Sequence, residues 1–169
     1  MTGLSVGTAK AKRGEIVSGW FDGVDLPTGD IDRFPVIVAQ GKSDGPAFWV
    51  TASIHGAEHT GLVAALRLAT PELVAKLRGT LVIVPTLNPA GLRTKQRSPY
   101  YFNGDPNRLF PEPRRSVEAR EPRNIPPPRL PNGAGIPSAL ETAYARLYDT
   151  IGATDPVALL DLHTAQIGS

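Results

Sequence analysis

The sequence predicts an α/β fold in which helices cover both faces of a mixed, largely parallel central sheet, a three-layer α/β/α arrangement. Two apolar runs support this prediction, LVIV at residues 81–84 and VALL at residues 157–160. Strands that are apolar on both faces are normally buried between helices. Segments of helical periodicity alternate with the expected strands, as is typical of α/β proteins. The length of 169 residues fits one unit, so we expect residues 1–169 to form a single domain.

Five segments rich in apolar and β-branched residues have the length and composition of strands. The segment between the first two, residues 22–32, is rich in Gly, Asp and Pro and predicts a connection between antiparallel neighbours. The predicted strands are residues 15–21, 34–40, 47–54, 81–86 and 157–162.

Two helices are predicted between the third and fourth strands. Residues 58–69 are apolar almost all round, with leucines and a valine among small alanines, which predicts a buried helix. Thr70 and Pro71 end this helix and begin another, with Thr70 as N-cap and Pro71 at the first helical position.

The last predicted helix spans residues 139–151 and begins with a capping box formed by Ser138 and Glu141. Before it, residues 111–137 are rich in Pro, Arg and Gly and lack periodicity, which predicts a long loop. The chain ends soon after a strand that ought to be covered by a further helix. We therefore expect the domain to be truncated at its C-terminus.

Composition narrows the classes of partner and ligand. The net charge is only +2, from 18 basic and 16 acidic side chains, so nucleic acid is not an expected partner. The chain has no cysteine, which leaves imidazole and carboxylate as its strong metal ligands. A signal-peptide pattern and a membrane-spanning apolar run are both missing from the sequence. We expect a soluble, cytoplasmic protein that does not bind membranes.

The stretch IHGAEHTG, residues 54–61, holds a candidate metal site. His55, Glu58 and His59 match H-x-x-E-H, in which both histidines bind zinc from one helical turn. That pairing needs residues 55–59 to be helical, which Gly56 and the preceding strand disfavour. In a purely structural interpretation, His55 is hydrogen-bonded, Glu58 caps a helix and His59 is solvated. The stretch joins a buried strand to a helix, however, where α/β proteins place their sites.

The other pairing uses His55 and Glu58 and requires a third ligand. His163 is the remaining histidine, and it follows a strongly apolar strand in LLDLHTA. If that strand is a parallel neighbour of residues 47–54, His163 reaches the same end of the sheet. Two histidines and one glutamate form the ligand set of catalytic zinc, with the fourth position open for water. The residues alone leave both pairings open.

Four blocks in order resemble a known family: SIHGAEHTG (53–61), PTLNPAGL (85–92), QRSPYYFNGDPNRLFP (96–111) and LLDLHT (159–164). On these blocks the chain resembles the zinc carboxypeptidase superfamily, within its succinylglutamate desuccinylase/aspartoacylase branch. The resemblance implies a carboxypeptidase-like fold of which this chain is the N-terminal part of the catalytic domain. It also implies a zinc ion bound by His55, Glu58 and His163, with His59 outside the ligand set.

The third block implies further roles by the same resemblance. Arg97 matches the arginine that polarises the scissile carbonyl, with Arg93 as a weaker competitor. Asn107 and Arg108 match the pair that binds the free carboxylate of the substrate, a task that suits the planar guanidinium. Asp105 matches an aspartate that accepts a hydrogen bond from the first zinc histidine and fixes its tautomer.

The implied activity is zinc-dependent hydrolysis of an amide in an N-acyl amino acid or a similar small molecule with a carboxylate. In the family the general base is a glutamate well downstream of the third zinc ligand, whereas this sequence ends six residues after His163. We therefore expect this chain to bind zinc but to hydrolyse poorly. The alternatives are a zinc carboxypeptidase acting on peptides and a non-catalytic module that binds metal and carboxylate. The acyl group, the amine and the oligomeric state are not indicated.

Overall fold

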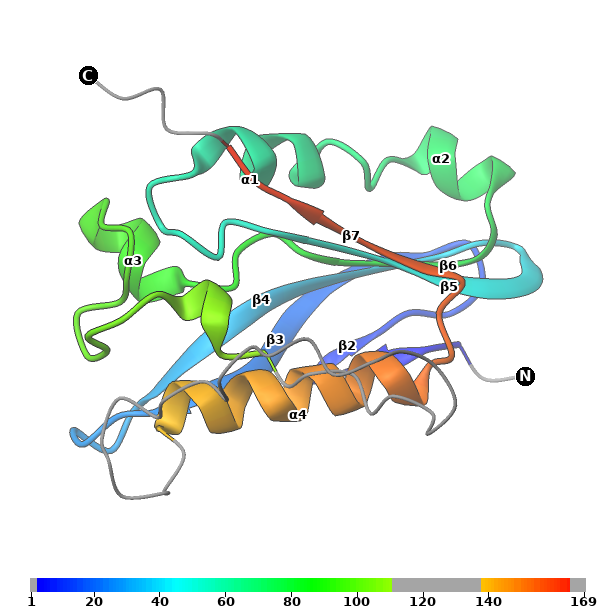
Figure 1. Ribbon diagram of the computed structural model, residues 1–169. Coiled ribbons are helices and arrows are strands. Elements are labelled where there is room, and N and C mark those ends of the chain that lie inside the picture. The colour runs from blue at the N-terminus through cyan, green and yellow to red at the C-terminus, as the bar shows by residue number, and fades with distance from the viewer. Residues whose placement is uncertain (1–2, 111–137, 165–169) are drawn as a thin grey trace, which may run out of the picture.

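The computed structural model describes residues 3–110 and 138–164. Figure 1 shows helices above and below a central sheet. In chain order the elements are β1 (Ser5–Val6), β2 (Ala9–Lys10), β3 (Ile16–Asp25), β4 (Ile31–Gln40), β5 (Ser43–Ala52), α1 (His59–Leu66), α2 (Pro71–Lys76), β6 (Arg78–Val84), α3 (Pro89–Thr94), the 3₁₀ helix η1 (Pro106–Arg108), α4 (Ala139–Ala153) and β7 (Ala158–Leu162).

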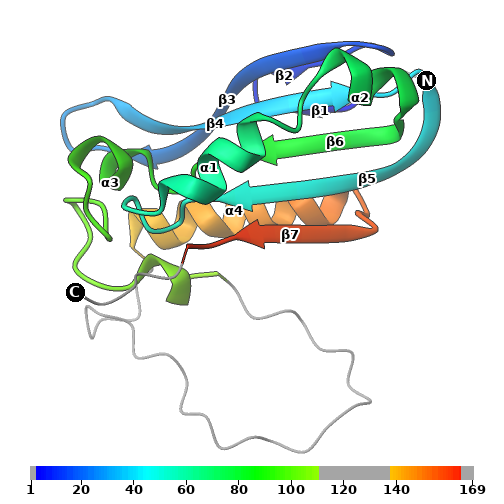
Figure 2. The same cartoon turned by 90° about the horizontal axis from the view of Figure 1, so that it is seen from above.

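The central sheet has five strands in the order β3-β4-β6-β5-β7, so each of the five predicted strands is present in it. The pairs β3–β4 and β4–β6 are antiparallel, whereas β6–β5 and β5–β7 are parallel. The sheet is therefore mixed, as predicted, and half of its pairings are parallel. Figure 2 shows β5, β6 and β7 running in the same direction, which brings their carboxyl ends to one end of the sheet.

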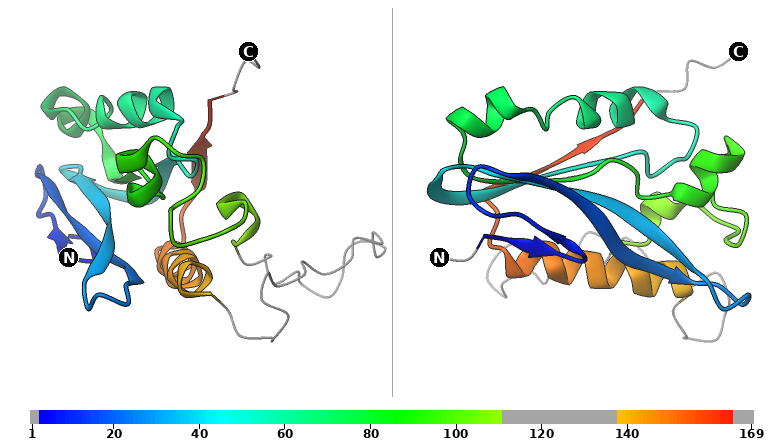
Figure 3. Two further views of the ribbon diagram at one scale, coloured as in Figure 1. Left: turned by 90° about the vertical axis from the view of Figure 1, so that its left-hand side faces the viewer. Right: turned by 180° about the vertical axis from the view of Figure 1, so that it is seen from behind.

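The predicted three layers are confirmed. Helices α1 and α2 cover one face of the sheet and α4 covers the other (Figure 3). Trp49, Phe34 and Tyr144 belong to the buried cluster on the α4 side, whereas Val50 and Ile83 belong to the cluster on the α1 side. Residues 49 and 50 are successive on β5, and successive side chains of a strand point to opposite faces. This alternation produces a core on each side of the sheet.

Both predicted helix starts are confirmed. The Thr70 side chain accepts a hydrogen bond from the Leu73 backbone N–H, and Pro71 is the first residue of α2. Ser138 and Glu141 form the predicted capping box of α4, in which each side chain accepts a hydrogen bond from the other residue's backbone N–H. Together these bonds satisfy backbone donors that the first turn of a helix leaves unpaired.

The prediction that the helix over residues 58–69 is buried is wrong. Helix α1 is shorter, and only Gly61 and Ala65 within it are buried. Val63 and Leu66 are 43% and 47% exposed. The helix lies against β5 and the edge strand β7, so the sheet covers just one of its sides. A pattern that is apolar all round does not reveal that the described residues cover only one side of the helix.

Three features were not predicted from the sequence, namely the β1–β2 hairpin, α3 and η1. The loop predicted at residues 111–137 lies outside the described residues, and the extent of the domain stays a prediction. Among the described residues, each helix is too short or too polar to cross a membrane.

Candidate metal centre

The candidate centre begins where β5 ends. Ser53 is buried and has a φ of 50°, in the left-handed region that non-glycine residues seldom adopt. The chain therefore turns sharply before His55. The Glu58 backbone N–H then donates to the His55 carbonyl at 3.0 Å, and Glu58 is the N-cap of α1. Residues 55–58 thus form a turn that precedes the helix.

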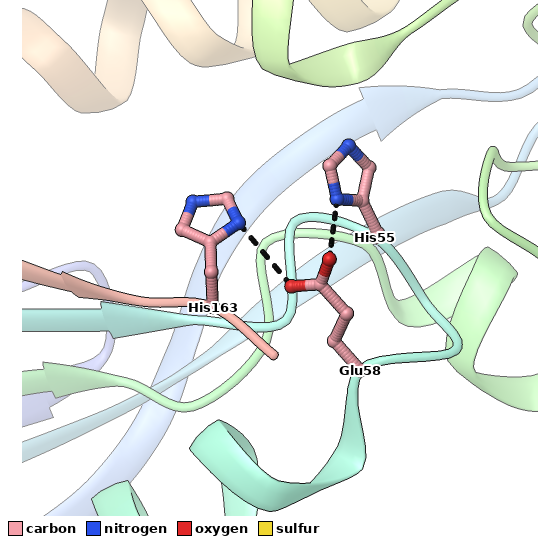
Figure 4. Close-up of side chains that lie close together, drawn as sticks. All are labelled: His55, Glu58 and His163. Atoms are coloured by element: carbon pink, nitrogen blue, oxygen red, sulfur yellow. Dashed lines mark hydrogen bonds and ion pairs between the residues drawn. The ribbon is translucent and has the colours of Figure 1, made fainter. Parts of the chain in front are cut away.

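Three side chains converge at this end of the sheet (Figure 4). His55 Nδ1 lies 2.7 Å from Glu58 Oε1, and His163 Nδ1 lies 3.2 Å from Glu58 Oε2. Each of the three offers one ligand atom, and these atoms all lie within 4.8 Å of one another. The parallel pairing of Leu162 with Ala52 accounts for the approach of His163 across more than a hundred positions of sequence.

Each histidine also contacts a second carboxylate through its other ring nitrogen. His55 Nε2 lies 2.9 Å from Asp105 Oδ1, and His163 Nε2 lies 2.7 Å from Asp161 Oδ2. Nε2 of each ring thus faces an aspartate, which when ionised can only accept a hydrogen bond, and Nδ1 of each ring faces Glu58. Asp161 accepts a further hydrogen bond from Thr51 Oγ1 at 2.7 Å.

This donor set fits a zinc ion. Two imidazole nitrogens and one carboxylate are the protein ligands of many catalytic zinc sites, and ligating histidines commonly donate their other N–H to a carboxylate. His59 is not part of the cluster, because its Nε2 donates to the Gly56 carbonyl at 3.1 Å. The H-x-x-E-H pairing requires a helical turn over residues 55–59, and the structure has a non-helical turn there.

Asp105 links the cluster to Arg97. Arg97 Nη2 donates to Asp105 Oδ2 at 2.9 Å, and the Asn107 backbone N–H donates to Asp105 Oδ1. Burial raises the pKa of Asp105, but the hydrogen bonds from His55, Asn107 and Arg97 outweigh this effect and hold the pKa well below its usual range. The carboxylate therefore stays ionised and remains an acceptor for His55 over the whole neutral range.

Comparison with known proteins agrees with this geometry. The profile of the succinylglutamate desuccinylase/aspartoacylase catalytic domain family matches residues 44–127. This segment is about half of the chain, which resembles the family over these residues. No curated protein matches the chain in a sequence comparison.

Solved structures with the same fold include the succinylglutamate desuccinylase/aspartoacylase of Rhodobacter sphaeroides, with 20% identity, a TM-score of 0.64, and coverage of 89% of this chain and 40% of that one. The product-bound ectoine utilization protein of Ruegeria pomeroyi shares 21% identity with a TM-score of 0.64, over 93% and 42% of the two chains. A protein of Burkholderia mallei assigned to the carboxypeptidases shares 17% identity with a TM-score of 0.59, over 89% and 35%. The chain thus has the carboxypeptidase-like fold and spans about two fifths of the length of these structures.

The structure gives different surroundings to the two arginines that were predicted as candidates for polarising a substrate carbonyl. Arg97 is connected to His55 by two hydrogen bonds in series, through Asp105. Arg93 instead pairs with the buried Asp32 on β4. Arg108 lies in η1 and is exposed, and its Nη1 donates to the Asn107 carbonyl at 3.1 Å. The carboxylate-binding role of Asn107 and Arg108 stays a prediction.

Asn88 joins three parts of the site. Its Nδ2 donates to the Ile54 carbonyl at 3.1 Å and to the Arg97 carbonyl at 3.0 Å, while its Oδ1 accepts from the Gly91 backbone N–H at 2.8 Å. The Gly56 backbone N–H also donates to the Arg97 carbonyl, at 3.2 Å. The turn at residues 55–58, the start of α3 and the backbone of Arg97 are therefore held together by one buried amide.

Asp161 and Thr51 were missed by the sequence reasoning. Asp161 stands two residues before His163, and residues two apart along an extended chain point to the same side. This D-x-H spacing was a usable signal for a carboxylate partner of the second histidine. The role of Thr51 could not be found this way, because it depends on its pairing with Asp161 across β5 and β7.

Proposed function

We propose that this protein is a zinc-dependent amide hydrolase, a deacylase for an N-acyl amino acid or a similar small molecule with a carboxylate. The family contains desuccinylases and aspartoacylases, which supports the reaction class. The convergence of His55, Glu58 and His163 is the observation that supports zinc. Two imidazoles and a carboxylate meet at the carboxyl ends of parallel strands, and binding of one metal ion is the simplest explanation for this arrangement.

In this proposal His55 and His163 hold zinc through Nδ1, and Glu58 completes the protein ligands. Bound zinc supplies a water molecule whose pKa falls to about 7, so that a nucleophile is available at neutral pH. Asp105 and Asp161 keep the proton on Nε2 of each ring, which leaves the Nδ1 lone pair free for the metal.

Arg97 would stabilise negative charge on the scissile carbonyl oxygen. Its side chain is half exposed, and one of its amino groups donates to Asp105. The other N–H groups of the guanidinium remain available to a substrate. Arg97 also lines an open hollow of about 640 Å³ formed by residues 96–103, whose lining does not include His55, Glu58 or His163. Loss of a single donor of this kind typically lowers the rate by about 10²- to 10³-fold. Asn107 and Arg108 would hold the free carboxylate of the substrate.

A general base remains to be assigned. Among the described residues, Asp105 and Asp161 are the carboxylates that contact the two histidines in addition to Glu58. Each already accepts hydrogen bonds from a histidine and one further side chain. Neither is therefore well suited to take a proton from water. Catalysis without a well-placed base is commonly slower by about 10²- to 10⁴-fold, so with these two aspartates alone beside the histidines we expect zinc binding and slow turnover. The same observation favours the second candidate, a module that binds metal and carboxylate without chemistry.

The test combines metal and substrate. Zinc binding to the metal-free chain is measured by titration calorimetry, and release of free amine is followed with N-succinyl-L-glutamate and N-acetyl-L-aspartate. We expect one zinc ion per chain, and amine release that needs zinc and is lost on Arg97→Ala. Zinc-dependent binding of the N-acyl amino acids without amine release would favour the binding module. Failure to bind zinc would refute both.

A further inference from the structure

Asp32 is a buried carboxylate outside the metal centre, at 3% exposure. It lies near the start of β4 and accepts hydrogen bonds from two side chains. Arg93 Nη2 donates to Oδ1, and Tyr101 Oη donates to Oδ2 at 2.8 Å. A buried charge is costly unless it is paired and hydrogen-bonded, and these two donors meet that need on separate oxygens.

The two donors flank Arg97 in the chain. Arg93 lies in the last turn of α3, and Tyr101 lies four residues beyond Arg97. Between them the chain reverses at Lys95, which ends α3 with a φ of 55°. Residues 93–101 thus form a loop whose two ends are tied to one carboxylate.

A second attachment holds the middle of this loop. The Arg97 carbonyl accepts hydrogen bonds from the Gly56 N–H and from Asn88 Nδ2, as described above. The backbone of Arg97 is therefore fixed against the turn at residues 55–58, while the ends of the loop are fixed against β4. Arg97 has to reach a carbonyl beside the metal centre, so the rigidity of this loop sets the position of its guanidinium.

The side-chain environment suits a permanent anchor. The Arg93 side chain is 61% exposed, so it offsets the charge of Asp32 without itself being buried. Burial raises the pKa of Tyr101, and the hydrogen bond to Asp32 raises it further, so the phenol remains a donor throughout the neutral range. Asp32 takes no part in the metal cluster or in the contacts of Asp105.

We propose that Asp32 is a positioning residue that holds, through Arg93 and Tyr101, the loop that presents Arg97 to the substrate carbonyl. The consequence for catalysis rests on the function proposed above, whereas the effect on the loop does not. The alternative is that Asp32 only stabilises the fold as a whole. Substitution of a positioning residue loosens the Arg97 loop, whereas substitution of a purely stabilising residue affects the whole protein.

The first experiment measures amide hydrogen exchange by NMR in Asp32→Asn and in the milder Tyr101→Phe. Gly56 and Phe102 are the reporters, because their N–H groups donate to the carbonyls of Arg97 and Pro99. We expect exchange at both reporters to rise by about tenfold or more in Asp32→Asn and less in Tyr101→Phe, because the loop opens locally. Amides in the middle of α4 should change by less than about twofold.

Two matched controls separate the loop from general effects. Asp44→Asn removes the carboxylate of an exposed pair with Arg13, and Tyr148→Phe removes a phenol hydroxyl on α4. Neither control should alter exchange at Gly56 or Phe102. Unchanged exchange at these reporters in both test variants would overturn the proposal. An equal rise across α4 would also overturn it, since Asp32 would then act on global stability alone.

The second experiment uses the zinc-loaded protein and an N-acyl amino acid. We expect kcat to fall by about tenfold in Asp32→Asn while KM stays within about threefold, because carbonyl polarisation is needed mainly in the transition state. A rise in KM with unchanged kcat would contradict the positioning role. If the unmodified chain shows no hydrolysis, the proposed hydrolase function is refuted. The exchange experiment does not depend on hydrolysis and still decides the role of Asp32.

Discussion

The two histidines of the candidate centre stand in very different surroundings. His55 is buried in the turn between β5 and α1, and its ring is enclosed by Glu58 and Asp105. His163 follows the edge strand β7, and its side chain is 36% exposed. One half of the centre is thus built into the core of the fold, whereas the other half stands at its border.

The difference has a structural origin. His55 and Glu58 are three residues apart, so one turn fixes both side chains. His163 reaches them only because β7 pairs with β5, and Leu159 and Leu160 of β7 are about half exposed. Local geometry therefore fixes the first half, and a long-range strand pairing fixes the second. We expect the His55 half to be the rigid one and the His163 half to be the adjustable one.

Removal of a ligand should have the largest effect and should not distinguish the halves. His55→Ala and His163→Ala should each lower zinc affinity by more than about 10²-fold, since even an outer hydrogen-bond partner of a ligand is worth about 10- to 100-fold. Zinc titration of the metal-free variants measures this.

His59→Ala is the matched control, because this histidine neighbours the cluster without joining it. Zinc affinity should stay within about threefold, far less than for a lost ligand. Loss of zinc in His59→Ala with retention in His163→Ala would instead establish the H-x-x-E-H pairing.

Removal of the carboxylate behind each ring should separate the halves. Asp105→Asn and Asp161→Asn should each lower zinc affinity by about 10- to 100-fold, with the larger loss for Asp105. The His55 ring is buried, so water cannot replace its acceptor, whereas the exposed ring of His163 can hydrogen-bond to solvent. Equal losses in the two variants would show that exposure of the ring makes no difference.

The sequence predicted the parts of the site that depend on short spacings or on one strand direction. The run of apolar residues before His163 predicted a strand, and the condition that this strand lies parallel to β5 is met in the structure, where His163 lies 3.2 Å from Glu58. The resemblance of the third block implied the contact between Asp105 and His55, and the structure contains it.

Features that depend on register or on tertiary cover could not be predicted. Asp32 lies in the polar segment that indicated a connection, yet pairing extends β3 to Asp25 and starts β4 at Ile31, which places Asp32 inside a strand. The exposure of α1 depends on how far the sheet reaches beneath it. Neither fact is contained in local composition, because both are set by which strands lie side by side.

Two glycines test the rigidity of the halves directly. A Cβ on Gly56 would lie 2.0 Å from the Gly91 carbonyl carbon, so Gly56→Ala forces the backbones of the turn at residues 55–58 and α3 apart. We expect a loss of about 1–3 kcal/mol in the free energy of unfolding. A Cβ on Gly61 would lie 2.9 Å from the Leu162 carbonyl oxygen, so a smaller shift of β7 relieves Gly61→Ala.

For Gly61→Ala the gain in helix propensity of about 1 kcal/mol offsets much of this strain, and we expect little net change. Urea unfolding of both variants gives the comparison. Gly152→Ala in α4 is the control, because a Cβ there meets nothing within 4 Å and should stabilise the protein by about 0.5–1 kcal/mol. A larger loss for Gly61 than for Gly56 would reverse the assignment of the rigid half.

Alkaline pH should lower the free energy of unfolding through Tyr101, which anchors the Arg97 loop beside His55. Of the four predicted effects this is the smallest. Burial and the hydrogen bond to Asp32 raise the pKa of Tyr101 above its ordinary value of 10.0. Below pH 10 both the folded and the unfolded chain keep this proton, so the stabilisation is complete. Above pH 10 the unfolded chain releases the proton while the folded chain retains it, so the free energy of unfolding falls as pH rises.

Tyr101→Phe should therefore flatten the loss of stability above pH 10 by at most one proton per molecule, in urea unfolding measured at intervals from pH 8 to 11. Burial raises the pKa of Tyr144 in the same direction, so Tyr144→Phe should flatten the curve too. Only Tyr101→Phe should in addition speed amide exchange at Gly56, because Tyr144 donates to the Leu87 carbonyl and not to the Arg97 loop. An equal effect of both variants on Gly56 would mean that the rigid half is held by the whole core, with no special part for Asp32.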